Sequence, residues 1–105
     1  MKMIRAIIRP EKEEEVIRGL DVAGFPSVTK MDVFGRGKQK GIQVGTAVYD
    51  ELAKTMLMVV VEDAMVEKAS QAITQSAKTG NFGDGKLFIT SVESVSTIRT
   101  GKAGL

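Results

Sequence analysis

The chain has 105 residues and a net charge of +2, and it contains neither cysteine nor histidine. This length predicts a single domain, and 43% apolar with 27% charged residues is typical of a globular protein. The composition excludes disulfides and imidazole-based catalysis, and it argues against a zinc site. A bound cation should therefore be a hard ion such as Mg²⁺, held by oxygen atoms.

The first residues form a strand and then a helix in our prediction. The segment 3–9, with the letters MIRAIIR, is rich in β-branched residues and predicts a strand. Pro10 suits the first turn of a helix, and the acidic residues that follow it favour the positive end of a helix dipole. Apolar residues then recur at helical spacing until Gly24 and Pro26 end the helix.

The rest of the chain alternates in the same way. Strands are predicted at 27–35, 55–62 and 86–95, the second of them buried on both faces near its end. A second helix begins at Asp63, which we predict to be its N-cap, and places its apolar residues on one face. Because helices and strands follow in the order βαββαβ, the expected fold is α+β and ferredoxin-like, with a four-stranded antiparallel sheet and helices on one face. The uncovered sheet face predicts an oligomer.

A long connection between strands 2 and 3, residues 36–54, is the unusual feature of this pattern. Connections within hairpins are commonly about 2 to 5 residues long, so the segment is expected either to be functional or to extend as a hairpin. The stretch 30–40 carries four basic residues and one acid. Gly35, Gly37 and Gly41 do not fit a dinucleotide-binding loop, because β-branched residues follow them where a helix should begin. They could form an ordinary turn or bind an anion through backbone N–H groups.

Two further glycine-containing segments carry basic residues. In GDGK, Gly83 and Gly85 permit close backbone approach, Lys86 offers a charge to phosphate, and Asp84 is expected to hold the turn through a local hydrogen bond. In IRTG, Arg99 can donate two hydrogen bonds to phosphate oxygens. Each segment alone is also compatible with a tight turn, but together they favour a nucleotide site between subunits.

The chain resembles the PII nitrogen-signalling family over essentially its whole length. The resemblance rests on MKMIRAIIRPEK at the start, GRGKQKG at 35–41, TGNFGDGKLFI at 79–89 and IRTG at 98–101. It implies a single domain, 1–105, with three named loops: the T-loop at 36–54, the B-loop at 79–86 and a C-terminal loop at 97–105. It also implies a cytoplasmic, non-catalytic sensor that forms a homotrimer, or a hetero-oligomer with a paralogue. From the residues themselves, we expect no membrane insertion, because no apolar run approaches about 20 residues, and no nucleic-acid binding, because the net charge is near neutral.

Ligand sites follow from the same resemblance, residue by residue. ATP or ADP would bind between subunits. 2-Oxoglutarate would bind with MgATP at the base of the T-loop, where Gln39 would complete the Mg²⁺ shell. The residues matched to ATP are Gly37, Gly83, Gly85, Lys86 and Arg99. The residues matched to 2-oxoglutarate are Gln39, Lys40, Gly41 and Lys54.

Departures from the common family pattern indicate a particular branch. The T-loop is short, so Tyr49 does not align with the tyrosine that is uridylylated in other members. Ala53 replaces a frequent proline, and Thr97 stands where many members have arginine. These features resemble the nitrogenase-associated branch, which implies dinitrogenase as the target. The alternative is a regulator of glutamine synthetase or of an ammonium channel.

Overall fold

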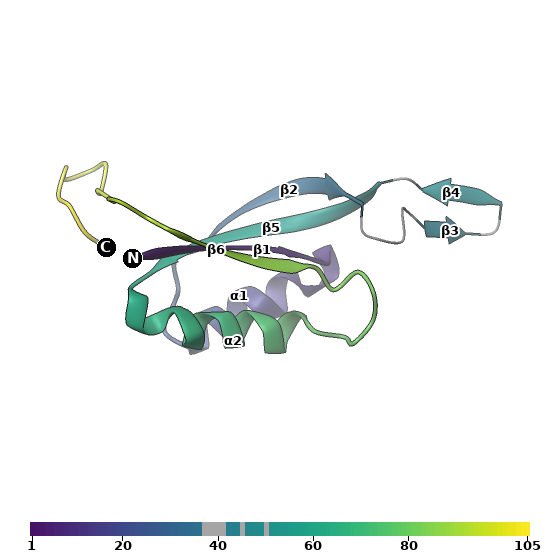
Figure 1. The fold of residues 1–105 in the computed structure, drawn as a ribbon, viewed down its shortest axis with the longest axis horizontal. Coiled ribbons are helices and arrows are strands. Elements are labelled where there is room, and N and C mark those ends of the chain that lie inside the picture. The colour runs from purple at the N-terminus through teal and green to yellow at the C-terminus, as the bar shows by residue number, and fades with distance from the viewer. Residues whose placement is uncertain (37–41, 45, 50) are drawn as a thin grey trace.

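The structure is a computed structural model and describes residues 1–36, 42–44, 46–49 and 51–105. Four strands, in the order β2-β5-β1-β6, form one antiparallel sheet, and both helices cover one face of it (Figure 1). The elements are β1 (Lys2–Ile8), the 3-10 turn η1 (Pro10–Lys12), α1 (Glu13–Val22), β2 (Thr29–Gly35), β3 (Ile42–Val44), β4 (Ala47–Tyr49), β5 (Leu52–Val61), the 3-10 turn η2 (Asp63–Met65), α2 (Val66–Ala77) and β6 (Lys86–Ser91). The predicted ferredoxin-like α+β fold is confirmed.

The core lies between the sheet and the two helices. Alternate residues of the two central strands are buried, because successive side chains of a strand point to opposite faces. The helices add residues from their apolar faces. The buried apolar side chains are Ile4, Ala6, Ile8, Val16, Leu20, Leu57, Val59, Val61, Ala69, Ile73 and Ala77.

The other face of the sheet carries no helix from the described part of the chain (Figure 1). The intervening residues of the central strands point to it, and they are half-buried, not fully enclosed. The prediction that the strand 55–62 is buried on both faces near its end is therefore wrong for the single chain, because no second layer from the described residues covers this face. On the outer strands, Met31 is 42% exposed and Phe88 is 47% exposed. Among the apolar residues at these positions, we call Met3, Ile7, Met31, Met56, Met58, Val60 and Phe88 the open sheet face.

The predicted ends of two strands differ from the observed ones. β6 ends at Ser91 and not at Val95, because Ser91 pairs with Lys2, the residue at which its partner strand β1 begins. β5 begins at Leu52 and not at Thr55, since residues 52–54 pair with the end of β2. In both cases the partner strand determines the boundary, which the local sequence does not show.

Asp63 does not cap a helix, and the prediction that it is an N-cap is wrong. Glu62 and Met65 occupy the cap positions of η2 and α2, without a side-chain hydrogen bond to the helix. The Asp63 carboxylate instead lies 2.9 Å from the amino group of Met1. This pair joins the start of β1 to the end of β5, and the adjacent ammonium group lowers the pKa of Asp63.

β3 and β4 form a separate two-stranded sheet that projects from the body of the protein (Figure 1). Ile42 pairs with Tyr49 and Val44 with Ala47. The extended hairpin, one of the two alternatives for residues 36–54, is thus present in the described part of this segment. A dinucleotide-binding loop would begin a helix directly after its glycines. A strand follows the glycines here, in agreement with the exclusion of that motif.

A polar cluster joins the start of α1 to the sheet. One oxygen of the Glu13 carboxylate accepts a hydrogen bond from the Lys30 ammonium group in β2. The other accepts one from the hydroxyl of Thr55, 3.2 Å away, which is 1% exposed. The hydrogen bond from Lys30 is the main cause of a lowered pKa at Glu13.

We expect this cluster to make stability depend on pH. A carboxyl group whose pKa is lowered by folding stabilises the folded state above its unfolded pKa of about 4.3, and this contribution is lost as the pH falls through the lowered value. Glu13→Gln should therefore reduce the urea midpoint at pH 7 and have a smaller effect at pH 3. An equal reduction at both pH values would contradict the assignment.

One buried hydroxyl has no partner among the described residues. Ser70 lies in α2, and its Oγ is inaccessible and accepts or donates no hydrogen bond there. Burying an unpaired hydroxyl costs about 1–3 kcal/mol, and alanine has the higher helix propensity. Ser70→Ala should therefore raise the free energy of unfolding by about 1 kcal/mol in urea denaturation. A loss of stability would show that the hydroxyl makes a bond in solution.

Candidate functional site

The loop 79–86, between α2 and β6, gathers most of the predicted site residues that the structure describes. Gly83 and Gly85 have φ angles of 98° and 108°, a region that favours glycine. A Cβ atom on Gly85 would lie 1.7 Å from the carbonyl oxygen of Ile7, so only glycine fits against the end of β1. The predicted B-loop is thus a tight turn that packs directly on the sheet.

Asp84 organises this turn. Its Oδ2 accepts hydrogen bonds from the backbone N–H groups of Thr79 and Gly80, each at 2.9 Å. Its Oδ1 accepts from the Thr79 hydroxyl. These donors hold the pKa of the Asp84 carboxyl well below its usual range. The expected local hydrogen bond of Asp84 is confirmed.

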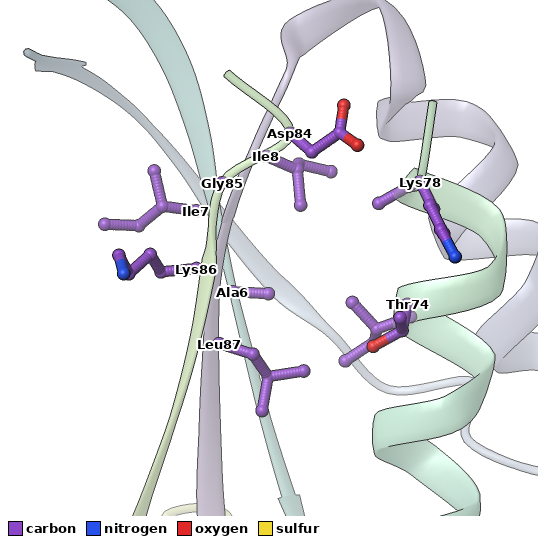
Figure 2. A pocket seen from close by; sticks show the side chains of 11 residues that line it. Ala6, Ile7, Ile8, Thr74, Lys78, Asp84, Gly85, Lys86 and Leu87 are labelled. Atoms are coloured by element: carbon purple, nitrogen blue, oxygen red, sulfur yellow. The ribbon is translucent and has the colours of Figure 1, made fainter. Parts of the chain in front are cut away.

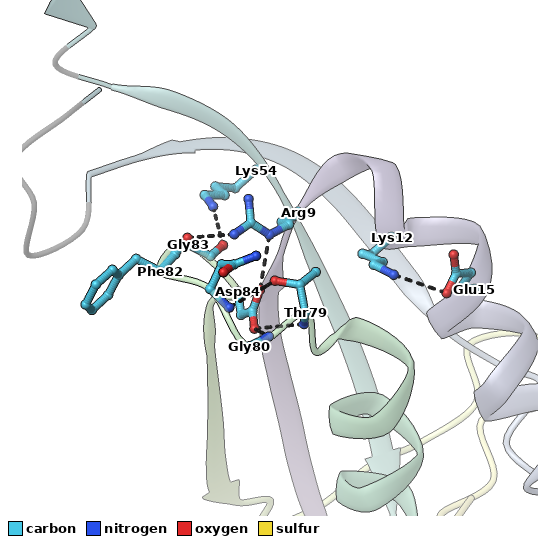
Figure 3. A network of polar contacts seen from close by, with 10 residues as sticks. Arg9, Lys12, Glu15, Lys54, Thr79, Gly80, Phe82, Gly83 and Asp84 are labelled. Atoms are coloured by element: carbon cyan, nitrogen blue, oxygen red, sulfur yellow. Dashed lines mark hydrogen bonds and ion pairs between the residues drawn. The ribbon is translucent and has the colours of Figure 1, made fainter. Parts of the chain in front are cut away.

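Two cations from distant parts of the chain also hold the loop (Figure 3). Arg9, just after β1, donates from Nε to Asp84 at 3.2 Å and from Nη2 to the Phe82 carbonyl at 2.6 Å. Lys54 of β5 donates from Nζ to the Gly83 carbonyl at 2.7 Å. Partial burial lowers the pKa of Lys54, and the nearby Arg9 charge lowers it further.

Arg9 is a site residue that the sequence alone did not indicate. Arg9 and Asp84 are 75 positions apart, and no spacing rule connects them. The only available signal was a basic residue at the end of a strand, immediately before Pro10. Its role depends on the antiparallel pairing of β1 with β6, which brings the end of β1 beside the loop.

Lys86 is the first residue of β6 and pairs with Ile7. The side chains of Lys86 and Ile7 project from one face of the sheet, whereas Ile8, Ala6 and Leu87 project from the other (Figure 2). Lys86 therefore points to the open sheet face. The small cavity below the loop, about 140 Å³, lies on the helix side, and it is smaller than the roughly 300 Å³ of typical ligand pockets.

Arg99 lies far from this loop in the same chain. β6 separates the loop from the C-terminal arm, residues 92–105 (Figure 1), and six strand residues span about 20 Å. Within the arm, Ser96 pairs with Ala103, and the N–H of Thr97 donates to the carbonyl of Lys102 at 2.9 Å. One chain thus places its predicted phosphate ligands at opposite ends of the sheet.

The remaining predicted ligands, Gly37, Gln39, Lys40 and Gly41, lie outside the described residues. The side chain of Tyr49 is likewise not described. In the part of the chain that is described, no three acidic residues gather as a metal site would require. A magnesium ion held there would need oxygen ligands from bound phosphates or from a keto acid.

Within the described ranges, no helix has both the length and the apolar character needed to cross a membrane.

Comparisons with known proteins give one consistent result. The family model described as nitrogen regulatory protein P-II matches residues 1–102. The chain is 58% identical over 105 residues, the full length of both, to "Nitrogen fixation nifHD region GlnB-like protein 1" of Methanothermobacter marburgensis. It is equally similar to "Nitrogen fixation nifHD2 region GlnB-like protein 1" of Methanosarcina barkeri. It is 45% identical over 108 residues to "Nitrogen regulatory protein P-II" of Azospirillum brasilense, with 99% of this chain and 96% of that one covered. The chain therefore belongs to the nitrogen regulatory protein P-II family.

Proposed function

We propose that this protein is a nitrogen-status sensor that binds ATP or ADP and 2-oxoglutarate between subunits and controls nitrogenase by direct binding. The observation that carries the proposal is the division of the site between the two ends of the sheet. The loop 79–86, with Lys86 and Lys54, lies at one end of the sheet, and the arm with Arg99 lies at the other (Figure 1). A complete site then requires a second copy or a paralogue.

The end that carries Arg99 offers a surface for the base of a nucleotide. An open cavity of about 550 Å³ lies there, lined mainly by apolar residues of the sheet and the arm, among them Met58, Val60 and Val95. Thr29 adds a polar group. If a neighbouring copy placed its loop 79–86 opposite this cavity, an apolar pocket for a base and a cationic loop for phosphates would meet, which is the usual composition of a ligand site.

Oligomer formation would also cover the open sheet face. Its apolar side chains are only half-buried in one chain, and contiguous exposed apolar surface of this kind commonly marks a protein interface. We propose a homotrimer, or a hetero-oligomer with a paralogue. Sedimentation equilibrium of the purified protein, alone and mixed with the paralogue, would distinguish either assembly from a monomer.

The charges fit the proposed effectors. ATP and 2-oxoglutarate are both anionic, and Lys86, Lys54 and Arg99 would offset their charge, with Arg9 beside Lys54 as an additional cation. Gln39 is the proposed protein ligand of Mg²⁺, which would offset more of the negative charge of the two effectors. Effector binding can change the T-loop only if its affinity differs between two loop conformations.

Nitrogenase is the proposed target because the similar archaeal proteins are named for a nitrogen fixation region. The relative from Azospirillum brasilense is named only as a nitrogen regulatory protein. A regulator of glutamine synthetase or of an ammonium channel is accordingly the second candidate. Retention of dinitrogenase, but not of those two proteins, on the immobilised sensor would support the first proposal.

Calorimetric titration of 2-oxoglutarate with Mg²⁺, with and without ATP, tests the effector proposal. Binding only in the presence of ATP would support a coupled sensor, and Gln39→Ala should then weaken 2-oxoglutarate more than ATP. ATP binding without any response to 2-oxoglutarate, also after addition of the paralogue, would reduce the protein to an adenine-nucleotide sensor. If neither ligand bound, the proposed function would be wrong.

A further inference from the structure

A negative charge lies in the loop that we propose to receive phosphates. Asp84 is two residues before Lys86 and directly between Gly83 and Gly85. Its carboxylate repels any polyphosphate that approaches the loop, and this repulsion decreases only slowly with distance. The presence of an ionised carboxylate at this point therefore opposes the proposed binding, unless Asp84 contributes something that outweighs the repulsion.

Its hydrogen bonds show what this contribution is. Four donors converge on the carboxylate: two backbone N–H groups, the hydroxyl of Thr79 and the guanidinium of Arg9 (Figure 3). The Thr79 hydroxyl in turn accepts a hydrogen bond from the N–H of Asn81 at 3.2 Å. We call Arg9, Thr79, Gly80 and Asp84 the Asp84 clasp. It closes the loop into a ring that runs from Thr79, two residues after the end of α2, to Asp84.

The clasp also determines how the next peptide groups are oriented. Arg9 donates hydrogen bonds to both the Asp84 carboxylate and the Phe82 carbonyl, and Lys54 donates one to the Gly83 carbonyl. In a trans peptide the C=O and N–H groups point in opposite directions, and the described residues contain no cis peptide. With both carbonyl oxygens held by cations, the N–H groups of Gly83 and Asp84 point away from those cations. Neither N–H forms a hydrogen bond of standard geometry with a backbone carbonyl of the described residues.

We infer that Asp84 is a positioning residue, which with Thr79 and Arg9 fixes the loop before a nucleotide arrives and presents these N–H groups to phosphate oxygens. The inference rests on the proposed function of the loop. A loop that is already ordered loses less conformational entropy when it binds. Successive N–H groups directed to one side form an anion-binding concavity. Both effects outweigh the repulsion by the carboxylate.

The test uses one substitution, Asp84→Asn, for which electrostatics and a positioning role predict opposite changes in ATP affinity. Asp84→Asn removes a negative charge beside the phosphates, and electrostatics alone predicts tighter ATP binding. The amide Nδ2 cannot accept the backbone hydrogen bonds, however, so a positioning role predicts ATP binding that is weaker by about tenfold or more in calorimetry. Unchanged or tighter binding by Asp84→Asn would overturn the inference.

Two matched variants separate charge from positioning. Thr79→Val removes a donor of the clasp without a change of charge, so it should also weaken ATP binding. Glu11→Gln removes another carboxylate whose charge acts on Lys54 but which makes no hydrogen bond to the described loop. It should leave ATP affinity unchanged or slightly increased. If Glu11→Gln reduced ATP affinity as much as Asp84→Asn, the positioning role would be overturned.

Hydrogen exchange of the ligand-free protein provides a readout that does not depend on nucleotide. The N–H groups of Thr79 and Gly80 should be protected in the unaltered protein and exchange faster in Asp84→Asn, while the strands keep their protection. Equal exchange in both proteins would overturn the inference but not the proposed function. Failure of the unaltered protein to bind ATP would overturn both the inference and the proposed function.

Discussion

Replacing Gly85 with alanine is expected to lower the free energy of unfolding by about 2–4 kcal/mol. The added Cβ atom would lie 1.7 Å from the Ile7 carbonyl oxygen and 2.8 Å from its carbon. These atoms belong to the β1–β6 ladder, in which Ile7 pairs with Lys86, so backbone would have to move. The φ angle of 108° adds strain for any residue with a side chain. Urea denaturation monitored by circular dichroism measures the loss.

Gly80→Ala is the matched control for this prediction. Gly80 lies in the same loop with a φ angle of 89°, but no described heavy atom lies within 4 Å of the position that a Cβ atom would occupy there. Alanine at this position should lower the free energy of unfolding only through conformational strain, by about 1 kcal/mol. Equal losses of stability in the two variants would show that the contact with Ile7 relaxes easily, and the argument from close packing would be wrong.

The regular part of the fold could be predicted because its signals are local. The β-branched residues of β1, the continuous apolar run of β5 and the helical spacing of apolar residues in α2 are each visible in a short stretch of sequence. The boundaries could not be predicted equally well. Ser91 ends β6 because its partner strand begins at Lys2, and Asp63 binds the amino group of Met1 in place of a helix end. These are contacts between residues far apart in the chain.

The candidate site, like the fold, could be predicted where its signals are local and could not be predicted where it depends on contacts between distant residues. Glycines and Lys86 in the loop 79–86 were identified from a short motif, and the hydrogen bonds of Asp84 within that loop followed from turn chemistry. Arg9 was missed because its contact with Asp84 depends on strand pairing. The distance between Lys86 and Arg99 also has no signature in the sequence, since it depends on the direction in which β6 continues into the C-terminal arm.

Lys86→Ala is expected to weaken ATP binding by about tenfold to a hundredfold. A charge-assisted hydrogen bond contributes about 1.5–3 kcal/mol, and about 1.4 kcal/mol corresponds to a factor of ten in affinity. Lys86 is exposed and makes no ion pair with a described residue, so the stability of the fold should change by less than about 0.5 kcal/mol. Calorimetric titration of ATP into the unaltered and substituted proteins measures the difference.

Lys78→Ala is the control, because it removes the same charge from a nearby position on the other side of the sheet. Lys78 lies beside the end of α2 at the small cavity, whereas Lys86 points to the opposite face (Figure 2). A direct contact with phosphate predicts a large loss of affinity for Lys86→Ala and almost none for Lys78→Ala. Similar losses that both disappear at high salt would instead indicate general attraction of a polyanion, because screening removes long-range interactions between exposed charges. In that case Lys86 would not be a specific phosphate ligand.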